Sequence, residues 1–119
     1  MTVSLMLSRM RTVALRRRKQ VVRDDESGYE TACTLLPATV QPLTGATAAQ
    51  MYGERLSMTK LLLTAPDTAM EVGMGVCVDV APSQPPDYRV VYVAGWSQHT
   101  VAHIRYIPET ERAAAPVIL

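Results

Sequence analysis

The chain has 119 residues, with twelve lysines and arginines against eleven aspartates and glutamates and a net charge of +1. This length suits one domain with a modest core, which oligomerisation would help to stabilise. The near-neutral balance disfavours bulk electrostatic binding to nucleic acid. No apolar run approaches the roughly 20 residues that a membrane helix requires, so we expect a soluble protein without a membrane partner.

The first segment, MTVSLMLSRMRTVALRRRKQVV, has two interpretations. It is rich in arginine and has no acid before Asp24, as is typical of a mitochondrial transit peptide. From Thr12 onward, Val13 and Leu15 also fit a first strand with a basic exposed face. We favour the strand and keep an imported organellar β-domain as an alternative.

Residues 23–30, RDDESGYE, predict a hairpin turn, because an acidic cluster and Gly28 separate two strand-like runs. The next run, YETACTLLPATVQPL, predicts a strand over residues 29–43. Pro37 and Pro42 interrupt it. Since proline cannot donate to a ladder, we expect this strand to lie at an edge or to bend.

The stretch TGATAAQMYGERL predicts one short helix of about two turns, with Thr47 and Gln50 as a capping box and Gly53 as its end. Strand character resumes in RLSMTKLLLTAP, residues 55–66. Pro66 and the turn-forming Asp67 end this strand.

The remaining chain predicts three further strands, over residues 72–81, 88–94 and 101–107. Two adjacent prolines keep the loop between the first two out of any sheet, and AGWSQHT turns the chain before the last. Alternation with a period of two assigns one face of each strand to the core. The residues expected to point inward are Met74, Val76, Val78, Val80, Tyr88, Val90, Tyr92, Ile104 and Tyr106.

These elements predict an all-β protein, a small antiparallel β-barrel or sandwich of about six strands with one short helix. We expect an N-terminal segment over residues 1–11, the barrel over residues 12–109 and a C-terminal tail over residues 110–119. The apolar end of the tail, APVIL, is expected to dock on a neighbouring copy or to remain disordered.

Cys33 and Cys77 are the only cysteines and have no CxxC partner, so a disulfide framework or zinc site has no support. We interpret both as buried thiols in a reducing compartment, with a single bridge between them as the alternative if the fold brings them together. His99 and His103 are four residues apart, a metal-binding spacing on a helix, but a strand separates them by about 13 Å. Nothing forms a phosphate loop or a nucleophile elbow. We therefore expect no enzyme activity, no cofactor and no metal.

The most distinctive polar feature of the sequence is the basic run formed by Arg16, Arg17, Arg18 and Lys19. It fits contact with phosphate or with an acidic protein surface, and it equally fits a charged edge that prevents aggregation. The acidic run that follows is expected to be solvated or to pair across an interface. Trp96, the single tryptophan, lies in a predicted turn as a hairpin-closing residue or an interface anchor. The candidate interface residues are Arg16, Arg17, Arg18, Lys19, Asp24, Asp25, Glu26 and Trp96.

The order of these elements, from the basic first strand through ACTLLPATVQPLTG, the short helix and RLSMTKLLLTAP to PDYRVVYVAGWSQHTVAHIRYI, resembles the small neck proteins of tailed bacteriophages. This family includes the head-closure, head-tail joining and minor capsid proteins. Val40-Gln41-Pro42 matches its V-x-P-like step, and Tyr88 and Val90 match its G-x-x-Y-x-V step, with a proline loop replacing the usual glycine. The resemblance spans roughly residues 12–109.

The resemblance implies a non-enzymatic virion protein at the head-to-tail junction, assembled in the host cytoplasm. Its copies would form a ring beneath the portal or adaptor protein, close the DNA-filled head and dock a tail-terminator or tail protein, with passing contact to genomic DNA. A small nucleic-acid-binding barrel remains the second alternative, although it would be expected to expose more aromatic side chains.

Overall fold

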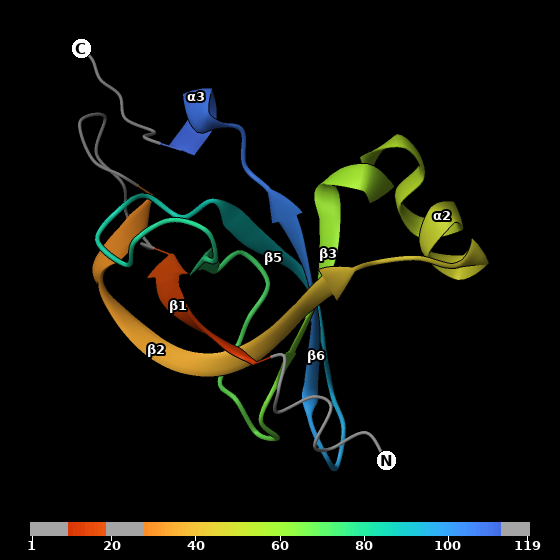
Figure 1. The fold of residues 1–119 in the computed structure, drawn as a ribbon, viewed down its shortest axis with the longest axis horizontal. Helices are drawn as coiled ribbons and strands as arrows, with labels where there is room; N and C mark the ends of the chain where they lie inside the picture. Colours follow the sequence, from red (N-terminus) through yellow and green to blue (C-terminus); the bar gives the residue numbers. More distant parts are fainter. Residues whose placement is uncertain (1–9, 19–27, 113–119) are drawn as a thin grey trace.

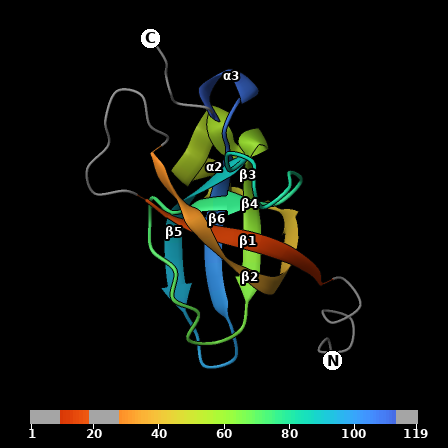
Figure 2. The same cartoon turned by 90° about the vertical axis from the view of Figure 1, so that its left-hand side faces the viewer.

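The computed structural model describes residues 10–18 and 28–112, and over these residues the chain forms a closed barrel of six antiparallel strands (Figures 1 and 2). Around the barrel the strands follow the order β1, β2, β3, β6, β5, β4. The predicted all-β class and antiparallel barrel are therefore confirmed. The elements are β1 (Arg11–Arg18), β2 (Tyr29–Pro42), α2 (Ala46–Tyr52), η1 (Gly53–Met58), β3 (Thr59–Thr64), β4 (Gly75–Cys77), β5 (Tyr88–Gly95), β6 (Thr100–Tyr106) and α3 (Glu109–Arg112).

The long strand β2 serves two neighbours in turn. Its first part pairs with β1 from Tyr29 to Ala38, and its last part, from Thr39, pairs with β3. Figure 1 shows β2 curving around the barrel between these two partners. Pro37 lies just before the change of partner, where the ladder to β3 has not begun, so the missing N–H costs no bond to β3. The expected bend of β2 is therefore confirmed. Residues 23–27 of the turn predicted before β2 lie outside the described residues.

The predicted helix exists, but its capping box is wrong. Gly45 is the N-cap, with a φ of 110°, and no side chain caps the helix. The carbonyl of Gly45 accepts the first hydrogen bond of the helix, from the N–H of Ala49 at 3.0 Å. A left-handed glycine thus starts the helix early and places Thr47 inside it. Gly53, with a φ of 54°, ends the helix as predicted.

The segment between α2 and β3 is also different from the prediction. Residues 55–58, expected to be strand, belong to the 3-10 helix η1, and β3 begins only at Thr59. The Thr59 hydroxyl donates to the carbonyl of Arg55 at 2.7 Å, which stabilises this last turn.

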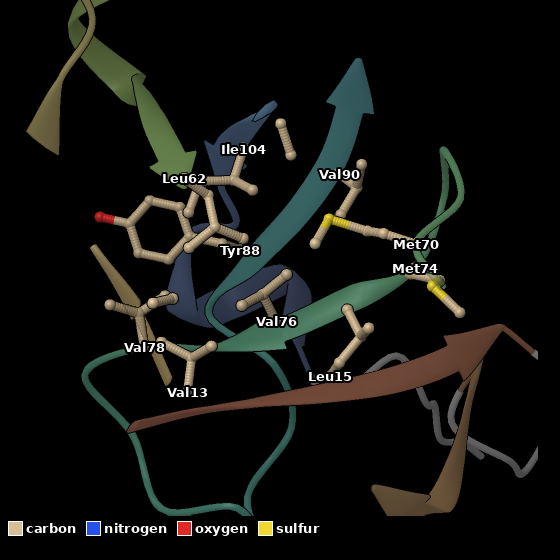
Figure 3. Close-up of a cluster of buried hydrophobic side chains, with 12 residues drawn as sticks. Val13, Leu15, Leu62, Met70, Met74, Val76, Val78, Tyr88, Val90 and Ile104 are labelled. Carbon is tan, nitrogen blue, oxygen red and sulfur yellow. The ribbon is translucent and has the colours of Figure 1, made fainter. Parts of the chain in front are cut away.

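The core fills the barrel with aliphatic, methionine and tyrosine side chains. Figure 3 shows side chains from β1, β3, β4, β5 and β6 converging on one interior, together with Met70 from the loop before β4. The inward prediction is confirmed for Met74, Val76, Val78, Tyr88, Val90 and Ile104, all of which are buried.

Tyr92 and Tyr106 were predicted to point inward, but both side chains are exposed. In β5, Val90 pairs with Ile104 but Tyr92 pairs with His103, so the register shifts at Val91. One extra residue turns every later side chain to the other face, which leaves Tyr92 39% exposed and packs Val93 against the core.

Tyr106 lies at the end of the barrel and is 38% exposed. Its ring packs edge to face against the buried Tyr88, with centroids 5.6 Å apart.

The predicted strand over residues 72–81 is reduced to the three residues of β4, because the buried carboxylate of Asp87 binds the backbone directly after it. Val80 consequently lies beyond the strand and is only half-buried. Among the described residues, no helix has the length and apolar character needed to span a membrane.

Candidate interaction surface

Arg16 lies inside the protein and not on its surface. Its side chain is 6% exposed. The Nε–H group donates to the carbonyl of Glu30 at 2.8 Å, and a terminal N–H group donates to that of Gln84 at 2.7 Å. Because β1 pairs with both β2 and β4 at this position, Arg16 charges no free edge of the sheet. Its role in the described chain is to tie the loop at residues 79–87 to β1.

The other residues of the predicted interface have different positions. Arg17 and Arg18 are exposed at the end of β1. Lys19, Asp24, Asp25 and Glu26 lie outside the described residues. Of the four basic residues of the predicted interface, the structure thus places two, Arg17 and Arg18, on the surface.

The loop at residues 79–87 covers the outer side of β4, and this explains the different burial of the two cysteines. Pro86 packs so closely over Gly75 that a Cβ atom there would lie 2.5 Å from its Cγ. Cys77 is buried beneath the loop, and loss of water raises the pKa of its thiol. Cys33 is exposed on β2, so its predicted burial is wrong. Both cysteines are free.

Trp96 lies in the turn that joins β5 and β6 and is 61% exposed. Its backbone N–H donates to the carbonyl of His99 at 2.8 Å, which closes the hairpin. The hairpin is therefore held by backbone bonding, while the indole ring stays accessible. A large exposed aromatic side chain on a rigid turn is suited to act as an interface anchor.

Beside Trp96, the outer side of the β5–β6 hairpin and helix α2 form a groove of about 450 Å³. Met51 from α2 and Tyr92 from β5 are both exposed there. No lysine, arginine, aspartate or glutamate lines this groove, so it is an uncharged surface next to the predicted anchor. We call it the α2 groove; its lining residues are Thr47, Met51, Tyr92, Ala94, Trp96, His99, Val101 and His103.

Two tyrosines hold His103, one of the lining residues of the α2 groove, in place. The Tyr52 hydroxyl lies 2.6 Å from Nδ1 of His103, and the Tyr92 and His103 ring centroids are 4.6 Å apart. Burial raises the pKa of Tyr52, which keeps its proton, and lowers the pKa of His103, which stays neutral. The Tyr52 hydroxyl and Nδ1 of His103 thus share a hydrogen bond between two uncharged groups, which attaches α2 to β6.

The α2 groove contains both histidines of the sequence. His103 belongs to β6 and His99 to the preceding turn. Within residues 10–18 and 28–112, no group of three or more His, Cys, Asp or Glu side chains is placed to hold a metal ion. Sequence reasoning missed Met51 and Tyr92 as surface residues, because the helical face of the first and the bulge that exposes the second depend on tertiary packing.

A second exposed apolar surface lies on β2. Cys33, Leu35 and Pro37 alternate along the strand, share one face and are all exposed, with Leu35 at 58%. We call these three residues the β2 stripe. The part of β2 that carries the stripe pairs with β1, and Figure 1 shows β1 on the opposite side of the barrel from α2.

A scan against protein-family models, a search of curated proteins and a search of solved structures each found no match for this chain.

Proposed function

We propose that this chain is a structural subunit of the neck of a tailed bacteriophage. Its copies form a ring beneath the portal or adaptor protein, and the ring closes the DNA-filled head and docks the tail. In this role the barrel is the scaffold, and the exposed surfaces act by binding other subunits. The order of the sequence elements, which resembles that of the neck proteins, supports this proposal.

The proposal of a ring is supported by two different apolar surfaces, the α2 groove and the β2 stripe. A head-to-tail ring needs two complementary surfaces on each subunit, because every copy meets one neighbour on each side. The uncharged lining of the groove suits the apolar side chains of the stripe, especially Leu35. We therefore assign the β2 stripe of one copy to the α2 groove of the next.

The position of the chain in the particle is the direct test of this function. Gold-labelled antibody against the chain, imaged by electron microscopy on purified phage particles, should mark the head-to-tail junction. Deleting the gene should yield filled heads that lose DNA, together with free tails. Particles that lack the chain and remain infectious would contradict the proposal.

The natural thiol of Cys33 gives a test of the subunit contact. A Met51→Cys variant places a second exposed thiol in the α2 groove. In assembled particles, mild oxidation should then give a ladder of disulfide-linked copies on a non-reducing gel. The ladder should vanish in a Cys33→Ser, Met51→Cys variant. A Glu54→Cys variant, with an exposed thiol in η1 outside the groove lining, is the matched control and should give no ladder.

A further inference from the structure

Three arginines from distant parts of the chain surround one hollow at an end of the barrel. Arg18 comes from the end of β1, Arg89 from β5 and Arg112 from α3, and together they line a space of about 180 Å³. Glu111 is the single carboxylate in this lining. No local pattern in the sequence brings these residues together, because the barrel closure and the position of α3 do so.

One of these arginines, Arg112, is held in place by groups that do not neutralise its charge. The Nε–H group of Arg112 donates to the carbonyl of Ile107 at 2.7 Å, and its guanidinium lies 4.9 Å from the centroid of the Tyr106 ring. Arg112 is therefore fixed in place by a backbone carbonyl and an aromatic face. Arg18 and Arg89 are exposed.

No described carboxylate pairs with this cluster. The salt bridge found among the described residues joins Arg11 to Asp79, and Glu111 approaches none of the three arginines within 4.0 Å. Arg89 also faces Arg105 across the β5–β6 ladder. Positive charge is thus concentrated around the hollow beyond what the described chain compensates.

The surroundings favour discrete carboxylates over a polynucleotide. The hollow contains Glu111, and Glu109 belongs to the same short helix, so the rim carries both signs of charge. A nucleic-acid backbone would bring a continuous row of negative charge against these glutamates. A protein segment places its carboxylates at separate points and avoids that repulsion.

We infer that Arg18, Arg89 and Arg112 form a docking site for a carboxylate-bearing segment of an adjoining protein subunit. Guanidinium groups match carboxylates with paired N–H donors, and three of them from different elements fix the orientation of the bound segment. The identity of the partner as a subunit of the same assembly rests on the proposed function. The site itself is independent of the α2 groove and the β2 stripe.

The test uses the isolated full chain and a fluorescently labelled ten-residue peptide that carries two glutamates separated by glycines and serines, with binding followed by fluorescence anisotropy at low salt. An Arg18→Glu, Arg89→Glu variant should bind the peptide at least about tenfold more weakly than the unmodified chain. An Arg17→Glu, Arg55→Glu variant is the matched control. It makes the same change in net charge at two exposed arginines outside the hollow, and it should bind within about twofold of the unmodified chain.

Two outcomes would overturn the inference. One is a failure of the peptide comparison: equal loss of binding in both variants would show that only net charge matters, and no binding to the unmodified chain would show that there is no site. The other is tighter binding of a short DNA duplex, lost in the Arg18→Glu, Arg89→Glu variant, which would make the hollow a polynucleotide site. Thermal unfolding of each variant verifies that the barrel is intact. Because this assay needs no particle, its failure is distinguishable from absence of the chain at the head-to-tail junction.

Discussion

The carboxylate of Asp87 accepts the backbone N–H of Val78 at 2.8 Å, and its second oxygen accepts that of Asp79 at 2.9 Å. Asp87 is 1% exposed and immediately precedes β5, whereas Val78 immediately follows β4. The carbonyl of Asp87 also accepts the N–H of Ile107, just after β6, at 2.8 Å. One residue thus closes both ends of the loop at residues 79–87 and links it to a third strand.

Replacing Asp87 should therefore destabilise the barrel. In Asp87→Asn one of the two backbone N–H groups faces an amide NH₂ group, so a buried donor loses its acceptor. We expect the free energy of unfolding to fall by about 1–3 kcal/mol, measured by urea denaturation. Asp79→Asn, which breaks the exposed pair with Arg11, should cost at most about 1 kcal/mol. Equal effects of the two changes would contradict this role of Asp87.

Arg16 and Arg17 should differ sharply although they are neighbours in the basic run. Arg16→Ser removes two charge-assisted bonds to backbone carbonyls and opens a space beneath the loop, so we expect a loss of about 2–4 kcal/mol. Arg17→Ser, at an exposed position, should change stability by no more than about 0.5 kcal/mol. Denaturant midpoints measure both. A test of the basic run in assembly must therefore leave Arg16 in place.

Gly75→Ala should destabilise the protein although the glycine lies in a strand. The added Cβ would lie 2.5 Å and 2.8 Å from two atoms of the Pro86 ring. Since that ring is rigid and buried, the loop must move, and we expect a cost of about 1–3 kcal/mol in thermal or denaturant unfolding. Combining Gly75→Ala with Pro86→Gly, which removes both of these ring atoms, should recover part of the loss, and no recovery would show that the close approach to Pro86 is not the cause.

Stability should decrease under mildly acidic conditions because of His103. Burial lowers its pKa below the ordinary value of 6.5, so below pH 6.5 the unfolded chain binds this proton more readily than the folded chain. The contribution of neutral His103 is therefore complete above pH 6.5 and is lost as the pH falls through the lower folded pKa. Unfolding free energies measured from pH 8 to pH 5 should show this decrease.

Two variants separate the titration of His103 from its hydrogen bond. His103→Gln should flatten the decrease between pH 6.5 and pH 5, whereas Tyr52→Phe should lower stability at every pH and retain the slope. An unchanged slope in His103→Gln would assign the pH dependence to other groups.

Trp96→Ala should separate folding from assembly. The side chain is largely exposed and the hairpin is closed by backbone bonds, so we expect a change in stability within about 0.5 kcal/mol. Incorporation of the chain into particles should nevertheless fall several-fold, as expected for loss of a tryptophan anchor. Quantitative immunoblotting of purified particles, against a Ser97→Ala control in the same turn, measures this effect.

Local pattern in the sequence determined approximately where the strands lie along the chain and which residues form much of the core. Alternating apolar residues at 74–78 and 88–90 predict which side chains face inward, because a strand turns successive side chains to opposite faces. Gly53 marked the end of the helix, and Pro37 marked the bend in β2, because their backbone limits act within a few residues. The turn that contains Trp96 was also predicted, because turn residues bend the chain locally.

Contacts between distant residues decided the rest. Arg16 is buried because the loop at residues 79–87 supplies the carbonyl of Gln84, and β4 ends early because the carboxylate of Asp87 competes for its backbone. The bulge at Val91 exposes Tyr92 because β5 must keep pairing with β6 around a closed barrel. Each of these outcomes depends on which distant residues come into contact when the barrel closes. The spacing of residues along one strand does not predict those contacts.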